Sequence, residues 1–324
     1  MTSLETIHKR LSEELGRIND IIAATLRTPN ELMNGVVTSY LRVKGKQIRP
    51  ILVLLSAQMF GEVNRKVIDG AAALEMLHNA SLIHDDVVDE TDMRRGYPTI
   101  NSRWGNRIAV LVGDYFVSNA LKVAISTGHI DIVDAISQLG CELSMGEIDQ
   151  ICNVRDHDLT EDSYFSMIEK KTASLFLNCV RIGADAVGAA PGEARPLIEY
   201  ARLLGLCFQI KDDIFDYFDS PEIGKPTGND LREGKVTLPL LHALATAPAP
   251  ERDEMVKLLE KQELEAPDIT RLIEFAKAHG GIDYAIAAMR RMQQEADVIL
   301  EQYPDTEARR SFRDIFEYII SRNK

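Results

Sequence analysis

Residues 82–89 read Leu82-Ile83-His84-Asp85-Asp86-Val87-Val88-Asp89, an acidic group set into a strongly apolar segment. The same Asp-Asp-x-x-Asp pattern returns at Asp212-Asp213-Ile214-Phe215-Asp216, again after apolar residues. In both copies the first and last carboxylates are four residues apart, so a helix would place them on one face. Two such faces directed at each other would form a set of oxygen ligands. Mg²⁺ uses ligands of this kind to hold diphosphate groups.

The alternative is that both motifs are solvated acidic turns, because aspartates are mostly exposed in folded proteins. The apolar flanks argue against this alternative. Uncompensated carboxylates in such surroundings would repel each other and would lose favourable hydration. The two motifs are therefore better interpreted as parts of a cation-binding site.

The hydrophobic periodicity is helical almost throughout, and no alternating strand pattern or short repeat is visible. We expect the first motif near the C-terminal end of a helix over 64–93, which Gly96 and Pro98 terminate. The second motif is expected near the end of a helix over 193–218. The other expected helices span 4–26, 30–43, 50–60, 104–126, 129–152 and 160–187, with shorter ones within 236–322. The sequence predicts an all-α fold and one domain over 1–324.

Composition excludes several classes of protein. With 324 residues and 45% hydrophobic residues, the chain can bury a sizeable core. A formal charge of -13 argues against nucleic-acid binding, which needs a basic surface. We expect no signal peptide and no transmembrane helix, and hence a cytoplasmic or peripheral protein. The four cysteines show no metal-ligand spacing and are expected to be buried free thiols: Cys141, Cys152, Cys179 and Cys207.

Basic residues beside predicted helix ends complete a candidate diphosphate site, because cations must neutralise the charge that Mg²⁺ leaves. Taken singly, each has a simpler interpretation, such as stabilising a helix C-terminus or solvating a helix face. Together with two acidic motifs they are better explained as one constellation. The candidates are Lys46, Arg49, Arg94, Arg95, Lys170, Lys171, Lys225 and Lys235.

The chain resembles the trans-type isoprenyl diphosphate synthases, also called polyprenyl synthetases. The resemblance rests on motifs that occur in the family's order across nearly the whole chain. These are residues 45–50 (Gly-Lys-Gln-Ile-Arg-Pro), 82–90 continuing to 93–96 (Met-Arg-Arg-Gly), 113–115 (Gly-Asp-Tyr), 146–148 (Gly-Glu-Ile), 171–173 (Lys-Thr-Ala), 208–213 (Phe-Gln-Ile-Lys-Asp-Asp), 224–225 and 234–235 (both Gly-Lys).

This resemblance implies an isoprenoid synthase fold, with a deep central cavity between antiparallel helices, and a prenyltransferase. An allylic diphosphate held by Mg²⁺, three ions per site, ionises to a carbocation and diphosphate. The double bond of isopentenyl diphosphate attacks the cation, and a proton is lost to the released diphosphate. The protein would contribute metal ligands, charge neutralisation and orientation rather than a nucleophile.

The resemblance also implies roles for individual residues. Asp85, Asp89 and Asp212 correspond to metal ligands, while Asp86, Asp213 and Asp216 would act through water or behind the ligands. Thr172 and Gln209 correspond to positions beside the forming cation, and Phe208 to a residue against the isopentenyl group. The allylic diphosphate would contact Arg94, Lys171, Lys225 and Lys235. The isopentenyl diphosphate would contact Lys46, Arg49, His78 and Arg95.

Small residues before the first motif predict a long product. Ala80 and Ser81 lie one turn before Asp85, where an aromatic residue would block the cavity near farnesyl length. Leu77, Leu74 and Phe116 are candidates for the deeper wall or floor. We expect a product of about thirty-five to fifty carbons, formed in a groove of several helical turns. Such a product suits a respiratory quinone side chain.

Four alternatives are open. The first is a short-chain geranylgeranyl or farnesyl diphosphate synthase, and the second is a non-catalytic regulatory subunit. A terpene cyclase is disfavoured by the loop over 45–50, since a cyclase has no second diphosphate to bind. A helical scaffold leaves the paired carboxylates unexplained. By analogy we expect a homodimer through the 104–126 helix, and transient contact with a membrane surface when the product is released.

Overall fold

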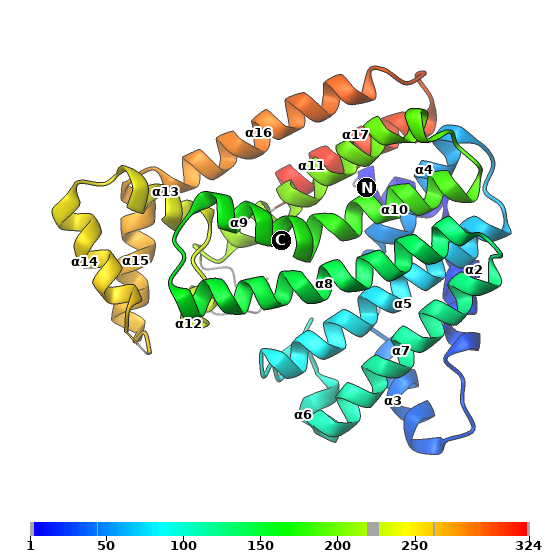
Figure 1. Cartoon of the computed structure of the whole chain (residues 1–324), viewed down its shortest axis with the longest axis horizontal. Coiled ribbons are helices and arrows are strands. Elements are labelled where there is room, and N and C mark those ends of the chain that lie inside the picture. The colour runs from blue at the N-terminus through cyan, green and yellow to red at the C-terminus, as the bar shows by residue number, and fades with distance from the viewer. Residues whose placement is uncertain (1–2, 44, 219–226, 262, 323–324) are drawn as a thin grey trace. The chain divides into compact units, whose positions relative to one another are not determined.

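The structure is a computed structural model and describes residues 3–43, 45–218, 227–261 and 263–322 (Figure 1). It is all-α, as predicted, apart from one two-stranded hairpin. The elements are α1 Ser3–Arg10, α2 Ser12–Thr25, α3 Glu31–Leu41, α4 Ile48–Phe60, α5 Arg65–Val88, β1 Met93–Arg94, β2 Tyr97–Pro98, α6 Ile100–Trp104, α7 Asn106–Ser126, α8 Ile130–Asp156, α9 Glu161–Ile168, η1 Glu169–Ala173, α10 Ser174–Ala186, α11 Pro191–Phe215, α12 Asn229–Arg232, α13 Leu238–Thr246, α14 Ala249–Leu259, α15 Ala266–Ala278, α16 Gly281–Leu300 and α17 Glu307–Ser321.

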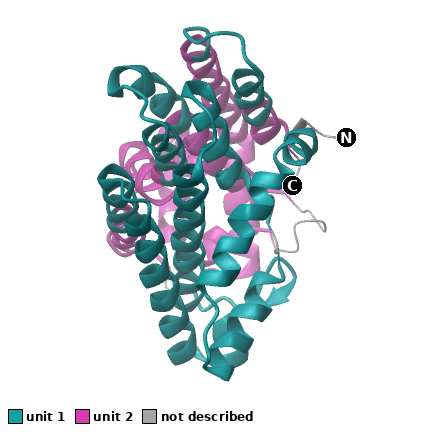
Figure 2. Ribbon diagram, turned by 90° about the vertical axis from the view of Figure 1, so that its right-hand side faces the viewer, with its two compact units in different colours: residues 1–141, 175–201, 300–315 teal, residues 142–174, 202–299, 316–324 magenta. Residues whose placement is uncertain are grey.

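The residues group into two compact units, coloured separately in Figure 2. The first unit comprises residues 1–141, 175–201 and 300–315. The second unit comprises 142–174, 202–299 and 316–324. The first acidic motif lies in the first unit and the second motif in the second unit. A single domain over the whole chain stays a prediction.

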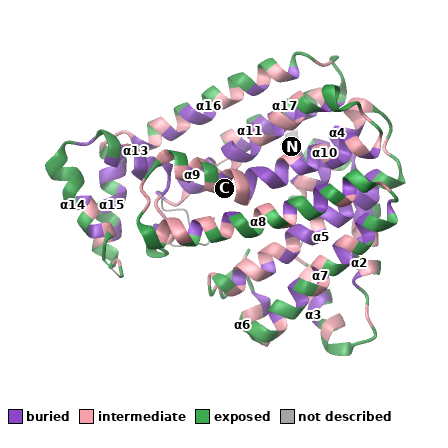
Figure 3. Cartoon of the chain, viewed as in Figure 1, coloured by how far each residue is buried: buried purple, intermediate pink, exposed green. Residues whose placement is uncertain are grey.

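The first unit is built around α4, on which every residue from Pro50 to Ala57 is buried (Figure 3). A helix that is apolar on all sides belongs at the centre of a core. The Ser56 hydroxyl donates to the Val180 carbonyl oxygen over 2.6 Å, which joins α4 to α10. Next to them, α5 packs along α7 (Figure 1). A β-carbon at Gly113 of α7 would lie 2.1 Å from Nε2 of His84, so this glycine permits the close approach beside the first acidic motif.

The second unit has its own apolar cluster on α13, α14 and α15. Tyr217, next to the second acidic motif, and Leu231 of α12 pack into this cluster. Its other buried members are Leu240, Ala243, Leu244, Ala247, Met255, Leu258, Ile269, Leu272, Ile273, Phe275 and Ala276. Residues 227–235 are therefore positioned by burial at Leu231 rather than by their own helical propensity.

Several predicted boundaries are wrong. The helix over 64–93 ends at Val88, because the chain turns at Glu90 with a positive φ of 50° and then forms the hairpin β1–β2. Arg94 and Arg95 therefore lie on this hairpin and not on a helical turn beyond Asp89. The helix over 4–26 is interrupted at Leu11. The helix over 160–187 starts at Glu161 with Thr160 as its cap, but it contains the π-helical turn η1.

The cysteines follow the prediction only in part. All four are free thiols, but only Cys179 and Cys207 are buried, while Cys152 is half-buried and Cys141 is exposed on α8. Among the described helices, α7 is long and apolar enough to cross a membrane by length and composition. Of its apolar window 44% is buried, and core helices pass the same test.

Candidate active site

The first acidic site, defined as Asp85, Asp89 and the cations around them, lies at the C-terminal end of α5. The Asp89 amide closes the last turn by donating to the Asp85 carbonyl oxygen over 2.8 Å. Both aspartates are half-buried. Four residues of spacing on a helix place both carboxylates on one face, as the sequence predicts.

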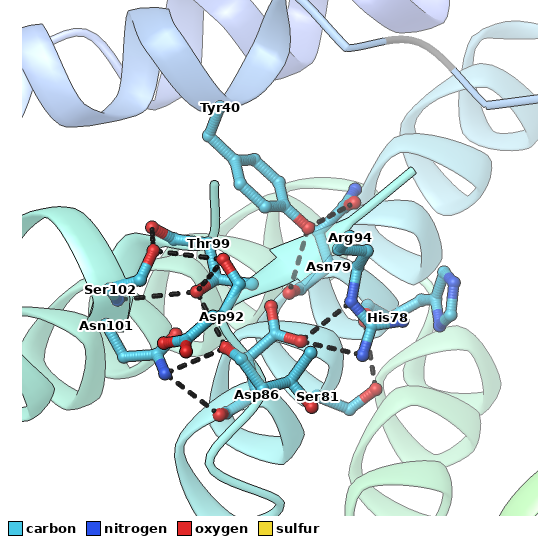
Figure 4. A network of polar contacts seen from close by, with 11 residues as sticks. Tyr40, His78, Asn79, Ser81, Asp86, Asp92, Arg94, Thr99, Asn101 and Ser102 are labelled. Carbon is cyan, nitrogen blue, oxygen red and sulfur yellow. Dashed lines mark hydrogen bonds and ion pairs between the residues drawn. The ribbon is translucent and has the colours of Figure 1, made fainter. Parts of the chain in front are cut away.

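Asp86, the middle carboxylate, points elsewhere (Figure 4). It is buried, and its Oδ1 accepts hydrogen bonds from Nε and Nη2 of Arg94, both over 2.8 Å. Two N–H groups of one guanidinium that share a single carboxylate oxygen fix the guanidinium in direction as well as in position. Asp86 therefore orients Arg94, and its predicted position behind the metal ligands stays a prediction.

The chain after the motif is held by side chains of α6 and its cap (Figure 4). The Asn101 amide donates to the carbonyl oxygens of Asp86 and Thr91 over 3.1 and 3.0 Å. The Thr99 hydroxyl donates to the Thr91 carbonyl oxygen over 2.8 Å, and the Ser102 hydroxyl to that of Asp92 over 3.1 Å. These bonds tie the chain between Asp86 and Asp92 to α6 and give partners to its backbone carbonyl groups.

Three arginines gather with His78 in the first unit. Burial, followed by the positive charges of Arg49, Arg95 and Arg94, holds the pKa of His78 well below its usual value. The ring is therefore neutral, and it can donate an N–H to an anion without adding charge. Desolvation raises the pKa of Glu75, one turn earlier, while Arg49 and Arg95 act against that rise.

The loop before α4 lies beside Arg95, one of the three arginines near His78. A β-carbon added at Gly45 would lie 2.7 Å from Nη1 of Arg95, so the backbone there touches the guanidinium. Gln47 holds a positive φ of 52°, and its side-chain amide donates to Oδ1 of Asn19 over 2.9 Å. This bond helps to hold a conformation that most residues avoid. It places Arg49 in the first turn of α4, next to the exposed Lys46.

The residues predicted to set product length lie on the buried sides of α5 and α7. Ala80 and Phe116 are fully buried, Leu77 is 6% exposed, and Ser81 is half-buried with its hydroxyl donating to the His78 carbonyl oxygen. The Phe116 ring packs edge-on against Tyr40 of α3, with 5.7 Å between centroids. Their effect on chain length stays a prediction.

The second acidic site, defined as Asp212 and the polar groups around it, ends α11. Its three aspartates have three different partners. Oδ1 of Asp212 accepts from Nη2 of Arg322 over 2.5 Å. Both carboxylate oxygens of Asp216 accept backbone N–H groups, from Asn229 over 2.9 Å and from Asp230 over 3.0 Å. Asp216 thus organises the chain that carries Lys235, and the metal-ligand role of Asp212 stays a prediction.

Asp213 is buried and is joined to Thr172 through Gln209. The Gln209 amide donates to Oδ1 of Asp213 over 2.7 Å, and the Thr172 hydroxyl donates to Oε1 of Gln209 over 2.7 Å. Desolvation, with repulsion from Asp230 and Asp212, raises the pKa of Asp213 to about 8. The hydrogen bonds from Tyr164 and Gln209 favour the carboxylate and act against that rise.

The predicted lysines of the second unit are held by acidic residues. Nζ of Lys171 lies 2.5 Å from Oε2 of Glu147 and 2.9 Å from Oε1 of Gln150. Nζ of Lys235 lies 2.6 Å from Oε2 of Glu233. Phe208 lies on α11, with the Arg322 guanidinium 4.3 Å from its ring centroid. Lys225 lies outside the described residues.

Gly146 lets α8 touch the π-helical turn that carries Lys171, and this contact gives a testable prediction. A β-carbon there would lie 2.6 Å from the Lys171 amide nitrogen, a backbone atom that cannot rotate away. Gly146→Ala is therefore expected to lower the free energy of unfolding by about 2 kcal/mol and to reduce turnover.

Gly16 of α2, which has no neighbour within 4 Å of an added β-carbon, supplies the control. Gly16→Ala is expected to stabilise the fold by about 0.5 kcal/mol with turnover unchanged. Denaturant unfolding and steady-state assays measure both variants. Equal stability of the two variants would contradict the close contact.

The donor set fits Mg²⁺. In the described parts of the chain, no three His, Cys, Asp or Glu side chains cluster tightly enough to hold a metal by themselves. Mg²⁺ is usually held by one or two carboxylates together with substrate phosphates and water, rather than by an all-protein cage. Asp85 and Asp89 offer two carboxylates in the first acidic site, and Asp212 offers one in the second. Basic side chains lie beside both sites.

Comparison with known proteins identifies the class. The polyprenyl synthetase family model matches residues 30–276. The chain is 34% identical to the octaprenyl diphosphate synthase of Escherichia coli K12, over 99% of this chain and 100% of that protein. The chain therefore belongs to the polyprenyl synthetase family, as its motifs predicted.

Solved structures of similar proteins support the same family and fold. A decaprenyl diphosphate synthase from Rhodobacter capsulatus superposes with a TM-score of 0.93 at 31% identity, over 99% of both chains. A polyprenyl synthase from Caulobacter crescentus CB15, complexed with calcium and isoprenyl diphosphate, has a TM-score of 0.90 at 28% identity, over 99% of this chain and 98% of that one. The predicted isoprenoid synthase fold is thus confirmed, whereas the roles of individual residues stay predictions.

Some residues of these sites were missed by sequence reasoning. The missed residues are Glu75, Tyr164 and Arg322, and spacing reveals no acidic or basic cluster that contains Tyr164 or Arg322. Arg322 lies 110 positions from Asp212, and Tyr164 lies 49 positions from Asp213. Glu75 is the exception, because it lies one turn before His78 and a helical plot places both on one face.

Proposed function

We propose that the protein is a Mg²⁺-dependent prenyltransferase. It condenses an allylic prenyl diphosphate, such as farnesyl or geranylgeranyl diphosphate, with successive molecules of isopentenyl diphosphate and makes a long-chain all-trans-polyprenyl diphosphate. One observation carries the proposal: the first acidic site pairs Arg94 with Asp86 beside its helix-end carboxylates, and the unit that carries Asp212 holds Lys171 on Glu147. Such a combination binds diphosphate through metal and side chains together.

Two sets of basic residues would bind the two diphosphates. Arg94, Lys171, Lys235 and Lys225 bind the allylic diphosphate, and Lys46, Arg49, His78 and Arg95 bind that of isopentenyl diphosphate. Bound Mg²⁺, three ions held by Asp85, Asp89 and Asp212, supplies Lewis-acid stabilisation of the leaving diphosphate. Asp86, Asp213 and Asp216 hold their neighbours in place.

The chemistry proceeds by cleavage of the allylic carbon–oxygen bond, which leaves a carbocation and diphosphate. Oxygen dipoles of Thr172 and Gln209 stabilise the cation. The double bond of isopentenyl diphosphate forms the new carbon–carbon bond, and a proton leaves to the released diphosphate. Phe208 packs against the isopentenyl group. Repetition lengthens the chain along α5, past Ser81, Ala80 and Leu77 and toward Phe116, which gives a product suited to a quinone side chain.

The assembly we propose is a homodimer in the cytoplasm, with transient contact to a membrane surface for product release. Support comes from α7, where Val110, Leu111 and Ile125 are 41%, 58% and 64% exposed. Exposed apolar residues on one helix are typical of a protein interface.

Labelled isopentenyl diphosphate tests the activity. With farnesyl diphosphate and Mg²⁺, the label is expected to enter an extractable product. A chelator is expected to abolish this incorporation, and added Mg²⁺ to restore it. Incorporation that is insensitive to the chelator, or no incorporation by folded protein, would contradict the proposal.

A further inference from the structure

A buried hydrogen-bond chain in the second unit ends at Tyr164, a residue without an assigned role. Tyr164 lies on α9 and is 3% exposed. Its hydroxyl donates to Oδ2 of Asp213 over 2.6 Å. Burial, with the Asp213 charge and hydrogen bond, raises the pKa of this phenol well above its usual value. The phenol therefore keeps its proton and acts as a donor.

The chain has a single direction. The Gln209 amide donates to Oδ1 of Asp213, and the Thr172 hydroxyl donates to Oε1 of Gln209, each over 2.7 Å. Oδ1 of Asp213 thus accepts from Gln209, whose amide nitrogen can only donate, and Oδ2 is bonded to Tyr164. The oxygens of Gln209 and Thr172 consequently keep lone pairs for another partner.

This direction matters because an amide has two unlike ends. With its NH₂ group committed to Asp213, Gln209 presents its oxygen. The opposite orientation would present N–H groups, whose positive ends repel a cation. Thr172 lies within the π-helical turn η1, whose backbone holds it in place. Such local irregularities often mark functional sites.

We propose that Tyr164 is a positioning residue. Through Asp213 it holds Gln209 and Thr172 with their oxygen dipoles directed at the allylic cation. The inference rests on the proposed function, since it deepens the role given there to Thr172 and Gln209. Preorganised dipoles act strongly on developing charge because they need not reorient during the reaction.

A purely structural role for the Tyr164 hydroxyl makes a different prediction. Losing a buried hydrogen bond lowers stability in either case. Only a positioning role also weakens the preference of the site for a positive charge. Tyr200 provides the matched control, because it is a fully buried tyrosine whose hydroxyl donates to the Phe312 carbonyl oxygen over 2.7 Å.

The test compares Tyr164→Phe and Tyr200→Phe by binding calorimetry in Mg²⁺. One ligand is an aza analogue of farnesyl diphosphate, whose ammonium nitrogen replaces the third carbon. The other is the S-thiolo analogue, which is neutral at that carbon and resists ionisation. Wild type and Tyr200→Phe are expected to prefer the ammonium analogue. Tyr164→Phe is expected to lose about tenfold of that preference, with the thiolo affinity unchanged.

Steady-state kinetics give the second readout. Tyr164→Phe is expected to lower kcat about tenfold with KM for both substrates unchanged, while Tyr200→Phe keeps the wild-type kcat. Wild-type ammonium preference and kcat in Tyr164→Phe would overturn the proposal. A wild type that elongates substrate yet shows no ammonium preference would also overturn it and leave the proposed function standing. A wild type that binds neither analogue and makes no product would overturn the function itself.

Discussion

Asp85→Ala and Asp212→Ala are each expected to lower kcat about a thousandfold. Each change removes a hard oxygen ligand from the site that activates the leaving diphosphate. The ligand cannot be replaced from nearby, because Asp86 is bound to Arg94 and Asp216 to the backbone of Asn229 and Asp230. Single-turnover assays at saturating Mg²⁺ measure the loss.

Stability must be separated from chemistry in these variants. Asp212→Ala removes the partner of Arg322, whose side chain is 9% exposed, so some loss of stability is expected. Asp212→Asn keeps an acceptor for Arg322 while it weakens the metal ligand, and it is expected to lose turnover with little change in thermal stability. Asp92→Ala is the control for the first acidic site. It changes an exposed aspartate in the loop that follows Asp89, and it is expected to retain turnover. Near-normal rates in both alanine variants would contradict the metal assignment.

Ala80→Tyr is expected to shorten the product from about thirty-five carbons or more to about twenty or fewer. A bulky ring one turn before Asp85 blocks the path along α5, while the first condensation continues. Because Ala80 is fully buried, the ring also crowds its neighbours. Ser81→Tyr is the second variant, since Ser81 is half-buried and has more room for a ring. Mass spectrometry of the dephosphorylated products measures chain length.

Ala73 offers a graded control on the same helix. It is fully buried and lies seven residues before Ala80, so it shares that face about 10 Å deeper. Ala73→Phe is expected to give products longer than those of Ala80→Tyr and no longer than those of wild type. Unchanged length in both Ala80→Tyr and Ser81→Tyr would remove the argument from small residues.

The sequence predicted the motif-bearing helices well because their signals are local. Apolar periodicity placed both acidic motifs at helix ends, where α5 and α11 have them. The predicted end of α5 lies five residues too far along the chain. Tertiary partners such as Asn101 and Thr99 hold the chain beyond Val88 in a non-helical path. Local propensity carries no information about such bonds.

Within the sites, sequence reasoning identified the charged residues but not their partners. Its motifs brought Thr172 and Gln209 into the candidate set, and the structure joins them by a hydrogen bond. It gave no indication that Tyr164 anchors Asp213 or that Arg322 pairs with Asp212, since these contacts join distant elements. Such pairs follow only from the packed fold, where a buried polar group must find a partner.

The length of the product tests the central claim most directly. Purified protein is incubated with farnesyl diphosphate, labelled isopentenyl diphosphate and Mg²⁺, and the dephosphorylated products are separated by chain length. We expect Mg²⁺-dependent products of about seven or more isoprene units. Products that stop at four units would contradict the long-chain assignment and favour a short-chain synthase. No product from folded protein would contradict the prenyltransferase itself and favour a regulatory subunit that lacks its partner.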